Sequence, residues 1–215
     1  TDLRPFWSLR NHEGALWLQC NERTLMASDT LSLMGRHNAL NALAALALTA
    51  CVVGIDGIDD HVLSALRNFR GLPHRMEIVG EIGGVRYIND SKATTVAATL
   101  AALEGLTMPT ILIAGGDGKK QSFVPLAEAV AQHCRAVLLI GRDAPLIEKA
   151  LMASDSKVTI ENCGTLDQAV RCAKTMARSG DIVLLSPACA SLDQFADYLA
   201  RGIAFTELIG AGEMR

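Results

Sequence analysis

The stretch Thr110-Ile-Leu-Ile-Ala-Gly-Gly-Asp-Gly-Lys119 decides the fold, because an apolar run of strand length passes directly into a polar loop rich in glycine. Two further polar loops, at 89–94 and 186–193, also follow apolar runs. Such runs occur at about 85–88, 110–114, 136–140, 157–160 and 181–185, with amphipathic segments of helical length between them. This alternation predicts an α/β fold with a doubly wound, mostly parallel sheet. Capping boxes at Thr165 and Ser191 predict that helices begin there.

A smaller part is predicted before this alternation. Residues 1–34 are typical of short antiparallel strands, 38–53 have the period of a helix ended by Gly54, and 59–69 predict a second helix. The breaker cluster Gly71-Leu-Pro73 then marks a boundary. We therefore expect two domains, 1–71 and 72–215, the second opening with a hairpin from 76 to 88.

Composition restricts the class of protein. The chain has 215 residues, half of them hydrophobic, and its net charge of -3 gives no reason to expect nucleic acid or a membrane surface as a partner. Its six cysteines form no C-x-x-C pair, so a reduced, cytoplasmic protein is the simplest interpretation. No apolar run is long enough to span a membrane, and residues 1–5 show no signal-peptide pattern and no initiating Met, which suggests a fragment.

The three polar loops should meet, since loops that leave the carboxyl ends of parallel strands converge on one edge of the sheet. This places Lys92, Lys119 and Ser191 together, and two ammonium groups beside helix N-termini suit a dicarboxylate or a phosphate. Simpler alternatives stay open at this point: Thr94 or Ser91 as a helix N-cap, Lys92 as a surface charge, and a glycine-rich turn with two solvated lysines.

Two amides are expected one helical turn apart, at Asn38 and Asn41. An amide both donates and accepts hydrogen bonds, which is what recognition of an adenine edge requires. The simpler alternative makes Asn38 an N-cap and His37 a packed or solvated imidazole. Arg75, just after the boundary, could clamp a phosphate or form a surface salt bridge.

Other known motifs do not match the residues of this chain. The loop at 115–119 is no Walker A sequence, because Ile113 and Lys120 stand where a Gly and a Ser or Thr are needed, and no G-x-G-x-x-G opens a helix. Cys189 has no His paired with it in sequence. The histidines at 12, 61, 74 and 133 form no ligand pattern, so we expect no protein-held metal.

Five motifs together resemble the Mur ligases, and the last three resemble the D-glutamate-adding member of that family. They are Gly35-Arg-His-Asn38-Ala-Leu-Asn41, Gly71-Leu-Pro-His-Arg75, Tyr87-Ile-Asn-Asp90-Ser-Lys92-Ala-Thr94, Gly115-Gly-Asp-Gly-Lys119 and Ser186-Pro-Ala-Cys-Ala-Ser191-Leu192-Asp-Gln-Phe195. The resemblance implies that ATP phosphorylates the carboxylate of UDP-N-acetylmuramoyl-L-alanine, and that the amine of D-glutamate attacks the acyl phosphate. A cytoplasmic, monomeric enzyme of peptidoglycan precursor synthesis is expected.

By this resemblance, residues 1–71 are the tail of a central ATP-binding domain and 72–215 a Rossmann-like C-terminal domain for the amino acid. The UDP-binding domain, the Walker lysine and a carbamylated lysine that serves Mg²⁺ would precede residue 1. We therefore expect the fragment alone to be inactive as a ligase.

The resemblance also implies roles for single residues. Asn38 and Asn41 would hold adenine, Asp90 the ribose hydroxyls, Arg75 the nucleotide phosphates, and Lys92 would lie near the phosphates and the reacting centre, so that Lys92 and Arg75 are the catalytic candidates. Thr94, Lys119, Ser191 and Leu192 would grip D-glutamate, and Tyr198, where the family often has Phe, would pack on it. Thr95 and residues 120–122 depart from the family pattern.

Two alternatives stay open. One is another Mur-type ligase, which adds a different amino acid or extends folate with glutamate. The other is a non-catalytic nucleotide- or metabolite-binding module of Rossmann type, in which the lysines bind a regulatory anion.

Overall fold

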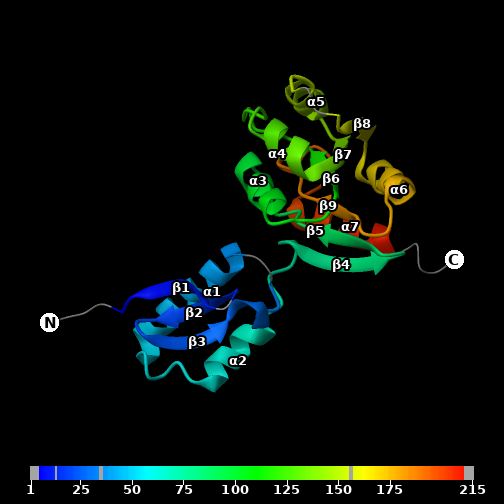
Figure 1. Ribbon diagram of the computed structural model, residues 1–215. Helices are drawn as coiled ribbons and strands as arrows, with labels where there is room; N and C mark the ends of the chain where they lie inside the picture. Colours follow the sequence, from blue (N-terminus) through cyan, green and yellow to red (C-terminus); the bar gives the residue numbers. More distant parts are fainter. Residues whose placement is uncertain (1–4, 13, 34–35, 155–156, 211–215) are drawn as a thin grey trace. The chain divides into compact units, whose positions relative to one another are not determined.

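The computed structural model describes residues 5–12, 14–33, 36–154 and 157–210. The chain divides into two compact units, Thr1–Gly71 and Leu72–Arg215 (Figure 1), and each is described by itself. Residues 1–4 lie outside the described residues, and so does Gly35 of the first motif. Part of the expectation about the chain start rests on residues 1–4. No helix in the described ranges combines the length and the apolar character needed to cross a membrane.

The first unit confirms the predicted strands and helices. The strands β1 (Trp7–His12), β2 (Ala15–Cys20) and β3 (Arg23–Ala27) form an antiparallel sheet in that order, and the 3-10 turn η1 (Ser28–Thr30), α1 (Arg36–Val53) and α2 (Asp60–Asn68) follow. Leu18, Leu46 and Ile58 lie in its core with at most 1% exposure. Burial of these apolar side chains holds the helices to the sheet.

The ends of α1 test two predictions. Gly54 does end the helix: its φ is +78°, and its N–H donates to the Ala50 carbonyl at 2.9 Å. The start differs, because α1 begins at Arg36 and so contains Asn38. The alternative that Asn38 is an N-cap is therefore wrong.

The second unit is built on a six-stranded sheet in the order β4-β5-β9-β6-β7-β8. Its strands are β4 (Glu77–Ile82), β5 (Val85–Asn89), β6 (Thr110–Gly115), β7 (Cys134–Ile140), β8 (Thr159–Gly164) and β9 (Ile182–Leu185). The predicted hairpin is confirmed, since β4 and β5 pair antiparallel, and all other neighbours pair parallel. The sequence prediction of a doubly wound, mostly parallel sheet is thus confirmed.

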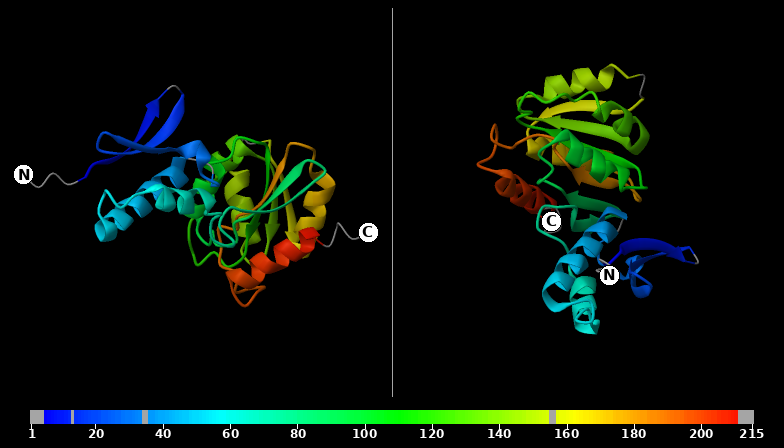
Figure 2. Two further views of the ribbon diagram at one scale, coloured as in Figure 1. Left: turned by 90° about the horizontal axis from the view of Figure 1, so that it is seen from below. Right: turned by 90° about the vertical axis from the view of Figure 1, so that its left-hand side faces the viewer.

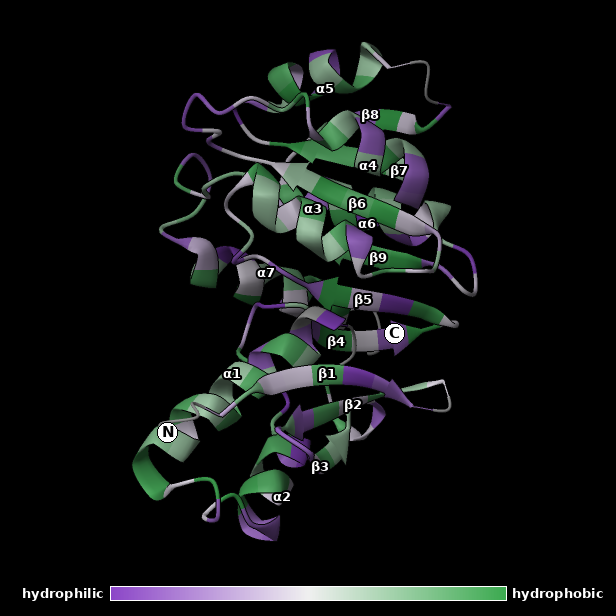
Figure 3. Ribbon diagram, turned by 60° about the vertical axis from the view of Figure 1, so that its left-hand side comes forward, coloured by the Kyte–Doolittle hydropathy of each residue, from purple (hydrophilic) through white to green (hydrophobic). Residues whose placement is uncertain are grey.

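Helices cover both faces of this sheet (Figure 2). They are α3 (Val96–Glu104), α4 (Leu126–His133), α5 (Ala144–Met152), α6 (Leu166–Met176) and α7 (Tyr198–Gly210). On β6, Leu112 belongs to the core cluster that includes α3, α4 and α5, whereas Ile111 and Ile113 belong to the cluster that includes α6 and α7. Successive strand side chains point to opposite faces, which is why the central strands β6, β7 and β9 are mostly apolar (Figure 3).

Two local predictions fail. The edge strand was expected at 157–160 but runs over Thr159–Gly164. Exposed polar residues, Glu161 and Asn162, interrupt its apolar pattern and so hide its true extent. Thr165 does cap α6, yet the box at Ser191 closes only one turn: the Ser191 carbonyl accepts from Phe195 N at 2.8 Å, and α7 starts at Tyr198.

Candidate functional site

Three loops leave the carboxyl edge of the second unit's sheet and are tied to one another, as the parallel topology requires. Asp117 in the β6 loop and Ala190 in the β9 loop exchange two backbone hydrogen bonds, of 2.9 and 2.8 Å. The Gln121 side chain accepts from Val96 N at 3.0 Å and donates to the Ala188 carbonyl at 2.6 Å, so it joins the β6 loop to the start of α3 and to the β9 loop. The loops form one bonded platform.

Two glycines allow this close packing. Gly115 and Gly116 have φ values of +127° and +129°. A Cβ atom on Gly115 would lie 1.9 Å from the Ile140 carbonyl oxygen, and one on Gly116 would lie 2.2 Å from the Ala190 carbonyl oxygen. The glycine-rich turn therefore has a structural cause of its own.

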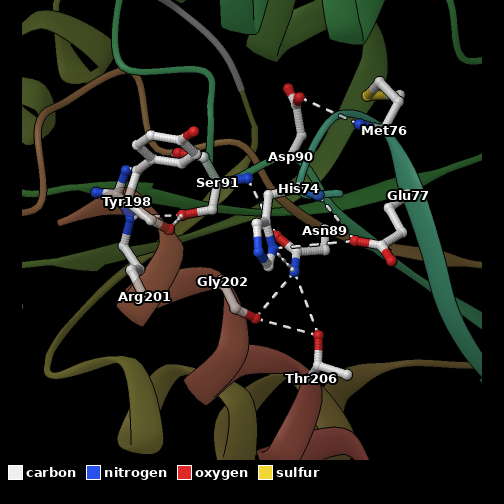
Figure 4. Close-up of polar contacts among 10 residues, drawn as sticks. All are labelled: His74, Met76, Glu77, Asn89, Asp90, Ser91, Tyr198, Arg201, Gly202 and Thr206. Atoms are coloured by element: carbon white, nitrogen blue, oxygen red, sulfur yellow. Dashed lines mark hydrogen bonds and ion pairs between the residues drawn. The ribbon is translucent and has the colours of Figure 1, made fainter. Parts of the chain in front are cut away.

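Lys92 lies against an aromatic ring. Its Nζ is 3.8 Å from the centroid of the Tyr198 ring, at the first residue of α7. Ser91 Oγ donates to the Tyr198 carbonyl at 2.8 Å, which fixes the start of α7 next to the β5 loop (Figure 4). Cation–π contact and hydrogen bond together bring two residues of the expected site into contact.

Arg201 is the main feature that sequence reasoning missed. It is 1% exposed and donates to Ser91 Oγ (3.0 Å), the Ser91 carbonyl (2.9 Å) and the Cys189 carbonyl (3.1 Å), while its Nη1 is buried without a protein partner among the described residues. Burial lowers the pKa of the guanidinium to about 10. A buried cation thus links the β5 and β9 loops. Figure 4 shows Arg201 beside Ser91 of the β5 loop.

Asp90 is almost buried at the end of β5, with 7% exposure. One carboxylate oxygen accepts from Met76 N at 3.2 Å, and the other lies 2.8 Å from Ser186 Oγ, its donor. Burial raises the pKa of this carboxyl to about 6, although the two hydrogen bonds and the charge of Arg75 act in the opposite direction. A carboxylate has about four acceptor positions, so Asp90 retains capacity for a further donor.

A second hydrogen-bond network, around Asn89 and His74, links the end of β5 to α7 (Figure 4). The Asn89 amide contacts His74 Nδ1 at 3.0 Å and donates to the Gly202 carbonyl at 2.9 Å, while its oxygen accepts from Ser91 N at 3.1 Å. His74 N in turn donates to a Glu77 carboxylate oxygen at 2.8 Å. Asn89 and His74 therefore hold the Asp90–Lys92 loop to α7. No sequence motif marks either residue for this role.

The remaining predicted residues are placed as follows. Lys119 is exposed with φ +49°, and its N–H donates to Asp117 Oδ1 at 3.0 Å. Ser191 is 3% exposed and Leu192 is 66% exposed. Arg75 is exposed next to Asp90, and Thr94 is half-buried.

The cap of α3 is Thr95, whose side chain accepts from Ala98 N at 3.4 Å, so the alternatives of Thr94 or Ser91 as N-cap are wrong.

The predicted adenine residues belong to the first unit. Asn38 and Asn41 lie three residues apart on α1 and so share one side of the helix. Asn41 is exposed and Asn38 half-buried. The side chain of His37, like Gly35, lies outside the described part.

Cys189 does not suit a nucleophile. Its thiol is fully buried, and burial raises its pKa to about 12. All six cysteines are free.

By its fold, this chain is a doubly wound α/β protein with polar loops gathered at the carboxyl edge of the sheet. Residues 74–189 match the family described as "Mur ligase, glutamate ligase domain". The match covers more than half of the chain, which therefore belongs to the Mur ligase family.

Two curated relatives support this family assignment. The chain is 53% identical over 193 residues to a UDP-N-acetylmuramoylalanine–D-glutamate ligase from Aromatoleum aromaticum, covering 89% of the chain and 41% of the relative. With the ligase of the same name from Chromobacterium violaceum the identity is 50%, over 92% of the chain and 43% of the relative. The chain thus spans about two fifths of these relatives.

The fold is similar to that of UDP-N-acetylmuramate-alanine ligase from Thermotoga maritima, with a TM-score of 0.66 at 20% identity over 92% of this chain and 43% of that one. The bifunctional folylpolyglutamate synthase/dihydrofolate synthase from Yersinia pestis gives the same TM-score at 14% identity, over 97% of this chain and 46% of that one. The fold alone therefore does not distinguish among these ligases.

Proposed function

We propose that the protein containing this chain is an ATP-dependent ligase that joins D-glutamate to UDP-N-acetylmuramoyl-L-alanine in peptidoglycan precursor synthesis, through an acyl phosphate. The observation that carries the proposal is the bonded platform of three loops, which gathers Lys92 and Ser191 with the Lys119 loop, in a chain half identical to two ligases named for this reaction. We place the enzyme in the cytoplasm as a monomer, with neither nucleic acid nor membrane as partner.

In this proposal residues 1–71 are the end of the ATP-binding domain and 72–215 the domain for the amino acid. Asn38 and Asn41 would contact adenine, Asp90 the ribose hydroxyls and Arg75 the phosphates. The geometry of Asp90 fits, because each of its oxygens has accepted only one hydrogen bond from the protein.

ATP would bring Mg²⁺, which supplies positive charge at the phosphates. Mg²⁺ prefers clustered oxygen ligands. Among the described residues, the one group of possible ligands contains two thiols, which does not fit Mg²⁺. We assign no residue of this chain to that ion. By the resemblance to the Mur ligases, the Mg²⁺ ligands would lie before residue 1, and on that proposal the isolated chain is inactive as a ligase.

For D-glutamate, the proposal assigns Lys119, Thr94 and Ser191 as hydrogen-bond donors to the two carboxylates, with Leu192 and Tyr198 packing on the substrate. Lys92 would offset the negative charge that develops when the amine attacks the acyl phosphate. Its contact with the Tyr198 ring holds the ammonium in one place before substrate arrives, which is how a charge is made ready for a transition state.

The test uses amide chemical shifts of the isotope-labelled protein. D-Glutamate should shift the loops at 89–95, 115–122 and 186–195 in a saturable manner, and L-glutamate should bind more weakly. Lys119→Ala should weaken D-glutamate binding roughly tenfold or more, since a hydrogen bond to a charged group contributes about 1.5–3 kcal/mol. Shifts outside these loops, or unchanged binding by Lys119→Ala, would contradict the assignment.

The same titration separates the alternatives. Another Mur-type ligase predicts a preference for a different amino acid, or for a folate, over D-glutamate. A non-catalytic module predicts tighter binding of NAD than of ATP or D-glutamate. In the longer protein, phosphate release from ATP should require both D-glutamate and UDP-N-acetylmuramoyl-L-alanine.

A further inference from the structure

Outside the three loops, a group of metal-ligating side chains lies where the edge strand β8 meets α6. Glu161 and Cys163 come from β8 and Cys172 from α6, and their ligand atoms all lie within 4.8 Å of one another. Cys172 Sγ is 3.2 Å from Glu161 Oε2. The sequence prediction of no metal site considered histidines and C-x-x-C pairs, and so did not address this group.

The spacing explains how the fold makes the group. Glu161 and Cys163 are two residues apart, so both side chains project from the same face of β8. Cys172 and Met176 are four residues apart and share one face of α6, with their sulfur atoms 3.5 Å apart. Because α6 packs against β8, these two faces oppose each other. The ligand atoms of Glu161, Cys163 and Cys172 converge there, and the Met176 sulfur lies beside that of Cys172.

The donors are those of a soft cation. Two thiolates and a carboxylate satisfy Zn²⁺, whose tetrahedral ligands at about 2.3 Å lie roughly 3.8 Å apart. The three ligand atoms, at most 4.8 Å apart, reach that spacing by small side-chain rotations. Water or the Met176 thioether can complete the fourth position. Thiolate and thioether donors disfavour Mg²⁺ and Ca²⁺.

Charge and access also suit a cation. The basic residues of α6 are engaged elsewhere: Arg171 forms an ion pair with Asp167, and Lys174 Nζ donates to the Leu208 carbonyl at 2.7 Å. Cys163 is 7% exposed, whereas Glu161 is exposed. A cation can therefore enter past Glu161 and be held by sulfur beneath it.

We propose that Glu161, Cys163 and Cys172 form a binding site for Zn²⁺ that fastens the edge strand β8 to α6. The site has a structural consequence for the sheet edge. Gly164, next to Cys163, accepts through its carbonyl from Gly141 N at 2.9 Å and from Gln194 Nε2 at 2.6 Å. A cation on Cys163 would thus steady the strand end that supports the β9 loop. The inference does not depend on the proposed ligase activity.

The experiment uses the reduced, metal-free protein. Zn²⁺ should bind with one-to-one stoichiometry in competition with a chromophoric chelator and should raise the melting temperature. Co²⁺ should give a thiolate-to-metal charge-transfer band together with the visible absorption of a tetrahedral site. Cys163→Ser and Cys172→Ser should each weaken Zn²⁺ binding at least tenfold, and Glu161→Gln less. Cys51→Ser, at an exposed cysteine in the other unit, should change nothing.

Several outcomes would overturn the site. They are no bound Zn²⁺, binding of equal affinity by Cys172→Ser, or a Co²⁺ spectrum without the charge-transfer band. A disulfide between Cys163 and Cys172 that forms in air, combined with no zinc binding by the reduced protein, would also end the proposal. Because Cys163 is buried, its variant could unfold; the half-buried Cys172 and the exposed Glu161 then still decide the question.

Discussion

The Asp90 carboxyl links ionisation to stability at the scale of one residue. Its pKa in the folded protein is raised to about 6 by burial, from an ordinary value of 3.8. Between about pH 4 and pH 6 the folded chain therefore holds the proton more tightly than the unfolded chain, so stability falls as pH rises through this window. Above it the full penalty of burying the charged carboxylate applies, roughly 3 kcal/mol at most.

Asp90→Asn should remove this penalty. The amide oxygen can still accept from Met76 N, and Ser186 Oγ can turn to accept from the amide. We expect urea unfolding to show a gain of about 1–2 kcal/mol above pH 7 that vanishes near about pH 4. A gain independent of pH would show that the ionisation of Asp90 is not its cause.

The contact between Lys92 and Tyr198 yields a second prediction. A cation above a partly exposed ring contributes about 0.5–1 kcal/mol. A double-mutant cycle with Lys92→Gln and Tyr198→Leu, measured by unfolding, should give a coupling energy of that size. A second cycle that starts from the Tyr198→Phe variant should give the same coupling energy, because Phe keeps the aromatic ring. Zero coupling would contradict the contact.

Single residues also show the limit of sequence reasoning. Lys92, Lys119 and Ser191 were predicted to lie at one edge, because loops that leave the carboxyl ends of parallel strands converge there. The structure does bring their three loops together. Arg201 was missed, since arginine is ordinarily exposed and nothing local marks one that turns inward. Whether these residues bind substrate stays a prediction.

At the scale of the element, strong apolar runs were predictable and mixed ones were not. β6, β7 and β9 are buried on both faces, so their sequences carry a continuous signal. β8 is an edge strand with exposed polar residues, and its bounds shifted accordingly. The turn at Ser191 has the residues of a capping box, but bonds between loops override this local preference.

The loop after β6 predicts the effect of a single methyl group. Gly116→Ala would place Cβ 2.2 Å from the backbone carbonyl of Ala190, which cannot move without breaking the bridge to Asp117. We expect a loss of roughly 3 kcal/mol or more in the free energy of unfolding. Gly180→Ala is the matched control, because its φ is +94° but nothing lies within 4 Å of the added atom, so it should lose about 1 kcal/mol. Equal losses would show that backbone conformation, and not the clash, dominates.

At the scale of the whole molecule, the two units differ in the core that each can form. The second has a six-stranded sheet with an apolar cluster on each face, whereas the first has three strands and one cluster. In the first unit α1 also exposes large apolar side chains, with Leu48 at 71% and Val52 at 85%. Smaller domains bury a smaller fraction of their surface and are less stable.

We therefore predict two thermal transitions, with the first unit unfolding at the lower temperature. Brief trypsin treatment between the two transitions should digest the first unit, where Arg67 and Arg70 precede the boundary, and leave a protected fragment that begins near Leu72. Amide exchange should then be slowest in β6, β7 and β9, whose residues are almost all buried. A single transition that all probes follow together would mean that the two units unfold as one. The boundary at Gly71 would then divide the chain into two compact regions that are not independently stable.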